Sequence, residues 1–366
     1  MDHASMFSSN CAIVFAPMTI GGTRSALRPN ETRGKLFMAT VYRPQPQVAS
    51  AAISRSESLL LHSRILQLLT LQAAHRPAGC MHLSAASGLV QAGKYLYVVA
   101  DDELALGRFE PSNAAPGVLV PLFDGALPVA ADSRKAAKPD VEALALLPAS
   151  PAWRHASLIA FGSGSRASRQ RGARVALNRH GAVVGPPHII DLAPLFAPIR
   201  HAFADLNIEG AFVSGDDLCL LQRGNTGDGR NACIRFDLET FTAWLQGRAA
   251  PPAVGSIAQF DLGELDGVPL GFTDGTALPD GGWLFSATAE ATADAYLDGP
   301  FTGSVVGRVD AGGQVAQIER LTGSYKVEGI ALAQDGAGHE LRMVTDADDR
   351  RAPALLLAAL LGPGLR

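Results

Sequence analysis

The sequence has few cysteines and no clustered metal-binding motif. Its four cysteines, Cys11, Cys80, Cys219 and Cys233, show no CxxC spacing, which argues against a zinc ribbon or a disulfide framework. Cys219 and Cys233 lie in apolar runs typical of strands, which favours small buried side chains over ligands or a disulfide. Unpaired cysteines fit a reducing compartment, and we expect a cytoplasmic protein.

Long apolar runs and strong charge are also missing. No segment approaches the ~18 apolar residues of a membrane span, and the run Leu355–Leu361 is too short. The formal net charge is −4, so the chain lacks the basic surface of a nucleic-acid-binding protein. We therefore expect neither a nucleic-acid partner nor a membrane partner, and we expect a monomer.

The first part of the chain differs in composition from the rest. Residues 1–58 are rich in Ser, Ala, Arg and Pro and have no hydrophobic periodicity, which predicts a disordered extension. Residues 11–20 are mildly apolar but lack the basic flank and cleavage site of a signal peptide. We expect one folded domain over residues 59–366.

A short motif recurs five times in this domain. Each copy has an oxygen-bearing residue, then Gly or Ala, then a short apolar run, as in Lys326–Leu332. The oxygen-bearing residues are Ser87, Glu142, Glu209, Asp274 and Glu328. They recur at intervals of about 54 to 67 residues, a spacing typical of propellers and solenoids.

Further strand-like segments follow each copy of the motif. Tyr95–Ala100, Cys233–Asp237 and Ile257–Asp261 are examples, and Gly- and Asp-rich turns separate them. Four strands per repeat make a propeller blade. The last repeat has room for three strands before residue 366, and residues 64–71 can supply the fourth. The sequence thus predicts an all-β, five-bladed β-propeller with four-stranded blades, closed by an N-terminal strand.

The innermost strand of each blade lines the central channel, so the five motif residues should face one another around the axis. Four carboxylates in a narrow space cannot all stay ionised without compensation by protons, water or a cation. Calcium suits an all-oxygen ring best, whereas magnesium needs a tighter octahedron and zinc prefers nitrogen or sulfur ligands. The alternative is a water-filled polar channel in which the carboxylates share protons.

A second set of polar residues follows the second strands. These residues are Asp101, Asp102, Arg223, Glu290 and Asp346. Since equivalent positions in a ring share one height, we expect them at one end of the channel. There, Asp101 or Asp102 could position or deprotonate water, and Arg223, as an exposed cation, could hold an anion.

Several stretches resemble the calcium-dependent apyrases, soluble nucleotidases of five-bladed propeller fold. The similar stretches are Lys94–Asp102, Gly271–Asp274 and Tyr325–Ile330. This resemblance implies a central calcium held by one polar residue from each blade. The sequence departs from the family pattern where a basic pair is expected, since only Arg223 is present, and a further lysine is replaced by the stretch Ala287–Glu290. The whole chain resembles more closely an uncharacterised group of bacterial propeller proteins, loosely akin to phytase-like propellers.

These observations leave several functions open. The first is a propeller with a central calcium site that binds a small polar or anionic ligand at the channel mouth. The second is a calcium-dependent hydrolase of phosphoesters or phosphoanhydrides. The third, by analogy of fold, is glycosidase chemistry on paired carboxylates.

Overall fold

The computed structural model describes residues 47–50, 59–73, 81–151, 153–224, 228–290, 301–334 and 339–366. The described residues all belong to one compact unit, Pro44–Arg366. Of the predicted disordered extension, residues 1–46 and 51–58 lie outside the described residues. Residues Gln47–Ser50 form a short strand, β1, so at least these four pair with the propeller.

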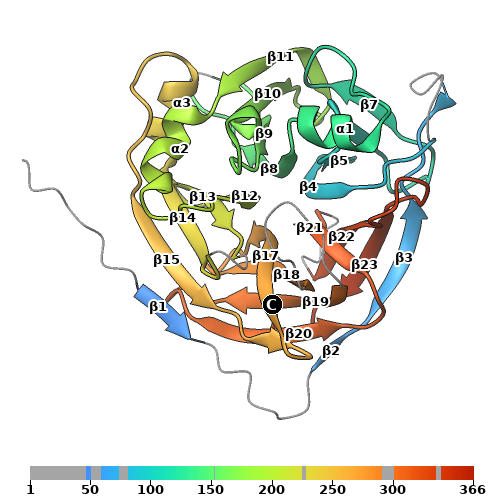
Figure 1. Ribbon diagram of the computed structural model, residues 1–366, viewed down its shortest axis with the longest axis vertical. Helices are drawn as coiled ribbons and strands as arrows, with labels where there is room; N and C mark the ends of the chain where they lie inside the picture. Colours follow the sequence, from blue (N-terminus) through green and yellow to red (C-terminus); the bar gives the residue numbers. More distant parts are fainter. Residues whose placement is uncertain are drawn as a thin grey trace, which may run out of the picture. The chain divides into compact units, whose positions relative to one another are not determined.

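Across the described residues, this unit is a ring of five β-sheets around a central axis, which confirms the predicted five-bladed propeller (Figure 1). In blade one the strands are β4 (Ala86–Ala92), β5 (Tyr95–Ala100), β6 (Ala105–Phe109) and β7 (Val118–Pro121). Blade two contains β8 (Val141–Leu147), β9 (Ser157–Gly162), β10 (Arg171–Leu177) and β11 (Val183–Asp191). Blade three contains β12 (Ile208–Ser214), β13 (Asp217–Gln222), β14 (Asn231–Asp237) and β15 (Ser256–Asp261).

Blades four and five complete the ring. Blade four contains β17 (Val268–Ala277), β18 (Trp283–Glu290), β19 (Phe301–Val309) and β20 (Val315–Leu321), with β16 (Glu264–Leu265) at its inner edge. Blade five contains β21 (Lys326–Leu332), β22 (Glu340–Asp346) and β23 (Leu355–Leu360). Its fourth strand is β3 (Ser63–Leu68), which pairs antiparallel with β23. The predicted N-terminal closure is therefore confirmed, with bounds slightly different from 64–71.

The N-terminal segment also adds strands to the outer edges of other blades. β1 pairs in parallel with β15 of blade three, and β2 (Leu60–Leu61) pairs in parallel with β20 of blade four. These pairings satisfy backbone groups that an outer strand would otherwise present to solvent. The sequence contained no periodic pattern that predicted them.

Short helices occupy the connections between strands. They are α1 (Ala131–Ala137), between blades one and two, α2 (Ala193–Arg200), between blades two and three, and α3 (Leu238–Leu245), within blade three. Leu195 and Phe196 of α2 are fully buried in the core between blades two and three, together with Phe241 of α3. In the described part of the chain, no helix is long and apolar enough to cross a membrane.

The hydrophobic core lies between neighbouring blades rather than at the axis. One cluster of buried apolar side chains fills each of the interfaces between adjacent sheets. Trp283 of β18, for example, is 1% exposed and packs against Phe212 of blade three, with ring centroids 5.3 Å apart. Cys219 and Cys233 are buried free thiols, as predicted, whereas Cys11 and Cys80 lie outside the described residues. Because apolar packing is confined to the interfaces, polar side chains can gather at the axis.

Candidate functional site: an acidic channel mouth

Each innermost strand is irregular at the same point of its ladder. One residue there has no partner on the neighbouring strand, which defines a β-bulge. The bulged residues are Ser87, Glu142, Glu209, Thr273 and Glu328. Four of these are motif residues identified in the sequence. A bulge interrupts pairing and re-aims a side chain, so the recurring motif marks the bulge of each blade.

In blade four the ring position belongs to Thr273, not to Asp274. Thr273 Oγ1 lies 2.7 Å from Ser286 Oγ and 2.9 Å from the Val327 carbonyl oxygen. The expectation that Asp274 is the ring residue is therefore wrong by one position. The ring formed by the bulged residues carries three carboxylates and two hydroxyls.

Asp274 occupies the position that is Gly or Ala in the other blades. A Cβ on Gly210 would lie only 2.8 Å from Asp274 Cα, which explains why the neighbouring strand keeps a glycine there. The Asp274 carboxylate is 1% exposed and accepts the N–H groups of Gly275 at 2.8 Å and Ile330 at 2.9 Å. Burial raises the pKa of Asp274 well above its ordinary value, while these backbone donors oppose the shift. Its role at the axis is to bind backbone N–H groups.

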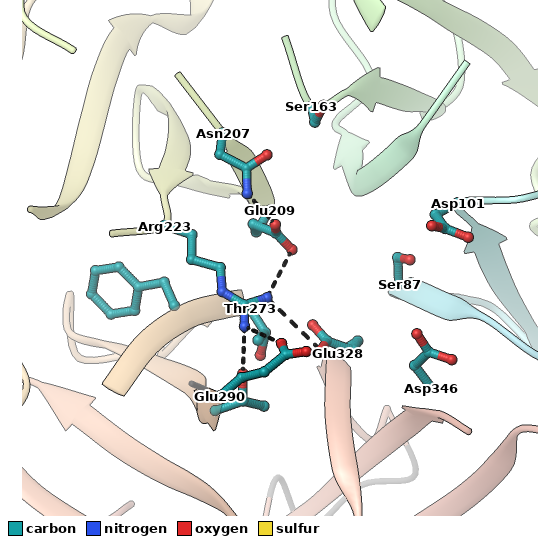
Figure 2. Close-up of polar contacts among 12 residues, drawn as sticks. Ser87, Asp101, Ser163, Asn207, Glu209, Arg223, Thr273, Glu290, Glu328 and Asp346 are labelled. Atoms are coloured by element: carbon teal, nitrogen blue, oxygen red, sulfur yellow. Dashed lines mark hydrogen bonds and ion pairs between the residues drawn. The ribbon is translucent and has the colours of Figure 1, made fainter. Parts of the chain in front are cut away.

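A second polar layer lies at the ends of the second strands. Strand register places five residues at equivalent points: Asp101, Ser163, Arg223, Thr288 and Asp346. Figure 2 shows four of them grouped around the axis of the ring, and we call this end of the axis the channel mouth. Asp101, Arg223 and Asp346 thus occupy equivalent positions, as we expected. Glu290 does not, because Thr288 holds that position and Glu290 follows two residues later.

Arg223 is the centre of an ion-pair network (Figure 2). Its guanidinium lies 2.9 Å from Glu290, 3.6 Å from Glu209 and 3.9 Å from Glu328. It also donates a hydrogen bond to Thr288 Oγ1 at 3.0 Å. Burial would lower its pKa, but the three carboxylates outweigh this and raise it. Arg223 is therefore a largely buried counter-charge of the ring, and the prediction of an exposed anion-binding arginine is wrong.

Lys326 is a second internal counter-charge, which the sequence analysis missed. Its ammonium lies 2.8 Å from Asp348, 3.4 Å from Glu290 and 3.8 Å from Glu328. Lys326 stands two residues before Glu328 in the same motif, so the sequence itself indicated a basic residue close to the ring. The compensation that the ring acids require therefore comes in part from a basic residue within a motif, which the sequence analysis did not consider.

The third part of the mouth is a cluster of carboxylates from blades one and two. Oxygens of Asp101, Asp140 and Glu142 all lie within 4.8 Å of one another, a separation at which one metal ion could be held. Lys138 Nζ pairs with Asp101 and lies 3.0 Å from Asp140 Oδ1. Arg169 lies 2.7 Å from Asp140 Oδ2. Asp140 stands just before β8 with a φ of 56°, a left-handed conformation that directs its side chain into the cluster.

Asp102 is not part of the carboxylate cluster and pairs with arginines instead. It is 7% exposed, and its carboxylate lies 3.1 Å from Arg350 and 3.5 Å from Arg134 of α1. Asp101 and Asp102, although adjacent in sequence, therefore have different partners. Only Asp101 contributes to the carboxylate cluster.

The mouth carries more negative than positive charge. Among the residues of the ring, of the second layer and of the ion pairs between them, eight carboxylates meet four cationic side chains, which leaves four negative charges unbalanced if every carboxylate is ionised. The carboxylates are Asp101, Asp140, Glu142, Glu209, Glu290, Glu328, Asp346 and Asp348, and the cations are Lys138, Arg169, Arg223 and Lys326.

Burial and neighbouring carboxylates raise the pKa of several of these groups. Burial raises the pKa of Asp101 to about 6 and that of Glu328 to about 8. Burial, together with Asp140 and Glu209, raises the pKa of Glu142 well above its ordinary value. One oxygen of Glu328, Oε1, is buried without a hydrogen-bond partner among the described residues, although Arg223 and Lys326 lie within 3.9 Å. The mouth therefore favours the uptake of positive charge, either as protons or as a cation.

Solved structures with a similar chain path share little sequence with this chain. A luciferin-regenerating enzyme is 12% identical, with a TM-score of 0.41 over 78% of this chain and 94% of that one. Glutaminyl cyclase from Myxococcus xanthus is 10% identical, with a TM-score of 0.45 over 84% of this chain and all of that one. A putative phosphatase from Bacteroides thetaiotaomicron is 10% identical, with a TM-score of 0.41 over 81% of this chain and 78% of that one.

The remaining comparisons concern the sequence itself. No curated protein matches the chain, and the resemblance to apyrases is not confirmed by any named relative. A family model covers residues 82–361, which includes all the polar residues of the channel mouth. The chain belongs to this family, DUF6929, which is described as a family of unknown function.

Proposed function

We propose that this protein is a binding propeller that takes up a divalent cation, with calcium as the best fit, at Asp101, Asp140 and Glu142. The observation that carries the proposal is the convergence of these three carboxylates within 4.8 Å, drawn from two neighbouring blades. A cation there would neutralise much of the unbalanced charge of the mouth. Burial and the neighbouring Asp140 raise the pKa of Glu142, and a cation would offset the repulsion from Asp140.

The donor set favours calcium over other biological cations. The cluster offers carboxylate oxygens and contains neither histidine nor cysteine, which argues against zinc. Calcium takes 6–8 oxygen ligands in flexible geometry, whereas magnesium requires a near-ideal octahedron. Three carboxylates supply only part of a calcium shell, so coordination positions remain for water or for a bound ligand.

We propose that the partner at the mouth is a small polar molecule with oxygen donors, bound through this cation. The excess of carboxylates disfavours direct binding of an anion, because Arg223 and Lys326 are already paired with acidic side chains. The hydrolase and glycosidase alternatives remain predictions. Incubating the calcium-loaded protein with phosphoesters and glycosides tests them by turnover.

The cation site is tested by titrating chelator-treated protein with calcium, magnesium, manganese and zinc. A calcium concentration a hundredfold above Kd should stabilise the folded state by about 2.7 kcal/mol, because only the native state presents the site. Glu142→Gln should weaken this response, since it removes one charge while keeping the shape. Asp132→Asn, on the exposed surface of α1, is the matched control and should respond as the wild type. Equal calcium responses in the wild type and Glu142→Gln would refute the site.

A further inference from the structure

Lysine is rare in this chain, and two of its few lysines lie at the channel mouth. The sequence contains only five, at positions 35, 94, 135, 138 and 326, while arginine supplies nearly all other basic residues. The side chains of Lys138 and Lys326 are only 12% and 8% exposed. A lysine ammonium is a compact point charge that resembles a small cation more closely than the planar guanidinium of arginine does. This placement suggests that the mouth uses ammonium groups in positions that a small cation could also fill.

The contacts of Lys138 are those that a bound cation would make. Its ammonium lies between Asp101 Oδ2 and Asp140 Oδ1, two of the carboxylates of the proposed cation site. The other oxygen of Asp140, Oδ2, is bound separately by Arg169 at 2.7 Å and by Ser163 Oγ at 2.6 Å. Removal of Lys138 would therefore free the Oδ1 side of Asp140 while the Oδ2 side remained bound.

The backbone of Lys138 is constrained, but its ammonium stands at the end of a flexible side chain. Lys138 caps the C-terminal end of α1 in an extended conformation, with φ −62° and ψ 141°, and Pro139 follows it. The proline restricts the backbone of Lys138, and Asp140 is held in its left-handed conformation. The backbone positions are thus constrained, whereas the four-carbon side chain of Lys138 can rotate.

We infer that Lys138 is a tethered cation that occupies the Asp101–Asp140 pair and must withdraw before a divalent cation binds. The inference rests on the proposed function, since it concerns the regulation of the same site. The ammonium occupies the space between these two oxygens that a metal ion would need, and two cations at contact distance repel each other. Lys138 thereby keeps the acidic cluster stable without metal and sets the threshold concentration for metal binding.

The direct test is calcium titration of chelator-treated Lys138→Met by calorimetry. We expect the Kd for calcium to fall at least about tenfold relative to the wild type, because the internal competitor is gone. Lys94→Met is the matched control: Lys94 is 60% exposed and pairs with Glu110 of blade one, so its loss should leave the Kd unchanged. Equal affinities in the wild type and Lys138→Met would overturn the inference. Absence of calcium binding in every variant would instead overturn the proposed function.

A second measurement uses the wild-type protein and so does not depend on folding of the variant. Acylation of lysines by an amine-reactive ester is followed by peptide mass spectrometry, with and without calcium. We expect Lys138 to react slowly without calcium and several times faster with it, while Lys94 reacts equally in both. If calcium binds and the reactivity of Lys138 stays constant, the ammonium does not withdraw and the inference fails.

Discussion

Asp274 of blade four binds the backbone of blade five: its Oδ2 accepts the N–H of Ile330 at 2.9 Å. The backbone N–H groups of Leu89 and Ala211, in blades one and three, also favour the ionised form of this carboxylate. One side chain thus faces the backbones of the innermost strands of three other blades.

Asp274→Ala should therefore destabilise the fold strongly. The substitution leaves buried N–H groups without acceptors, and each such group costs about 1–3 kcal/mol. Asp274→Asn retains one acceptor oxygen and should cost less than Asp274→Ala. Equilibrium unfolding in urea measures both, with the exposed Asp132→Asn as control. Equal stability of Asp274→Ala and the wild type would show that the axis does not need this carboxylate.

Arg223→Met should destabilise the protein by about 3–5 kcal/mol, as expected when one partner of a buried ion-pair network is removed. Glu209, Glu290 and Glu328 would lose a shared counter-charge. An exposed anion-binding arginine would instead change stability by less than about 1 kcal/mol. Chemical denaturation distinguishes the two outcomes. Arg351→Met, at a largely exposed position, serves as the control.

Glu328 should make stability depend on pH. Burial raises its pKa from the ordinary 4.5 to about 8, so between these values the folded state binds a proton that the unfolded state releases. The contribution to stability is complete below pH 4.5 and is lost as pH rises through 8. Its slope is at most about 1.4 kcal/mol per pH unit. Glu328→Gln should flatten the decline, and an unchanged pH profile would contradict the assignment.

Closure by the N-terminal strand predicts different effects of two truncations. A chain beginning at Pro44 should unfold at the wild-type midpoint, since Pro44–Arg366 is a compact unit. A chain beginning at Thr70 lacks β3 and the buried Leu61 and Leu69, so blade five loses its outer strand and the ring should lose cooperative unfolding. Thermal unfolding followed by circular dichroism measures both. An unchanged midpoint after removal of β3 would mean that it does not close the ring.

The repeat predicted the fold well because a propeller builds every blade from the same local pattern. In four of the five blades the oxygen-bearing residue of the motif marks a bulge, which is why Ser87, Glu142, Glu209 and Glu328 were found from the repeated motif. The ring residue of blade four was predicted wrongly because Thr273 and Asp274 are adjacent and both side chains carry oxygen. Only the strand register distinguishes them.

The site was less predictable than the fold, because charge balance depends on contacts between blades. Asp140 and Lys138 lie at the end of an irregular connection, where no periodicity indicates the direction of a side chain. Glu290 was expected in the same layer as Arg223, but it reaches Arg223 from a point two residues beyond that layer. Ion pairs of this kind follow from tertiary packing, so patterns along the sequence cannot predict them.

Calorimetric titration of the chelator-treated protein with calcium, in parallel for the wild type and Glu142→Gln, tests the central claim most directly. We predict a single saturable binding event in the wild type, with one calcium per chain, and a clearly higher Kd in Glu142→Gln. Absence of saturable calcium binding by the wild type, or the same Kd in both proteins, would contradict a cation site at Asp101, Asp140 and Glu142.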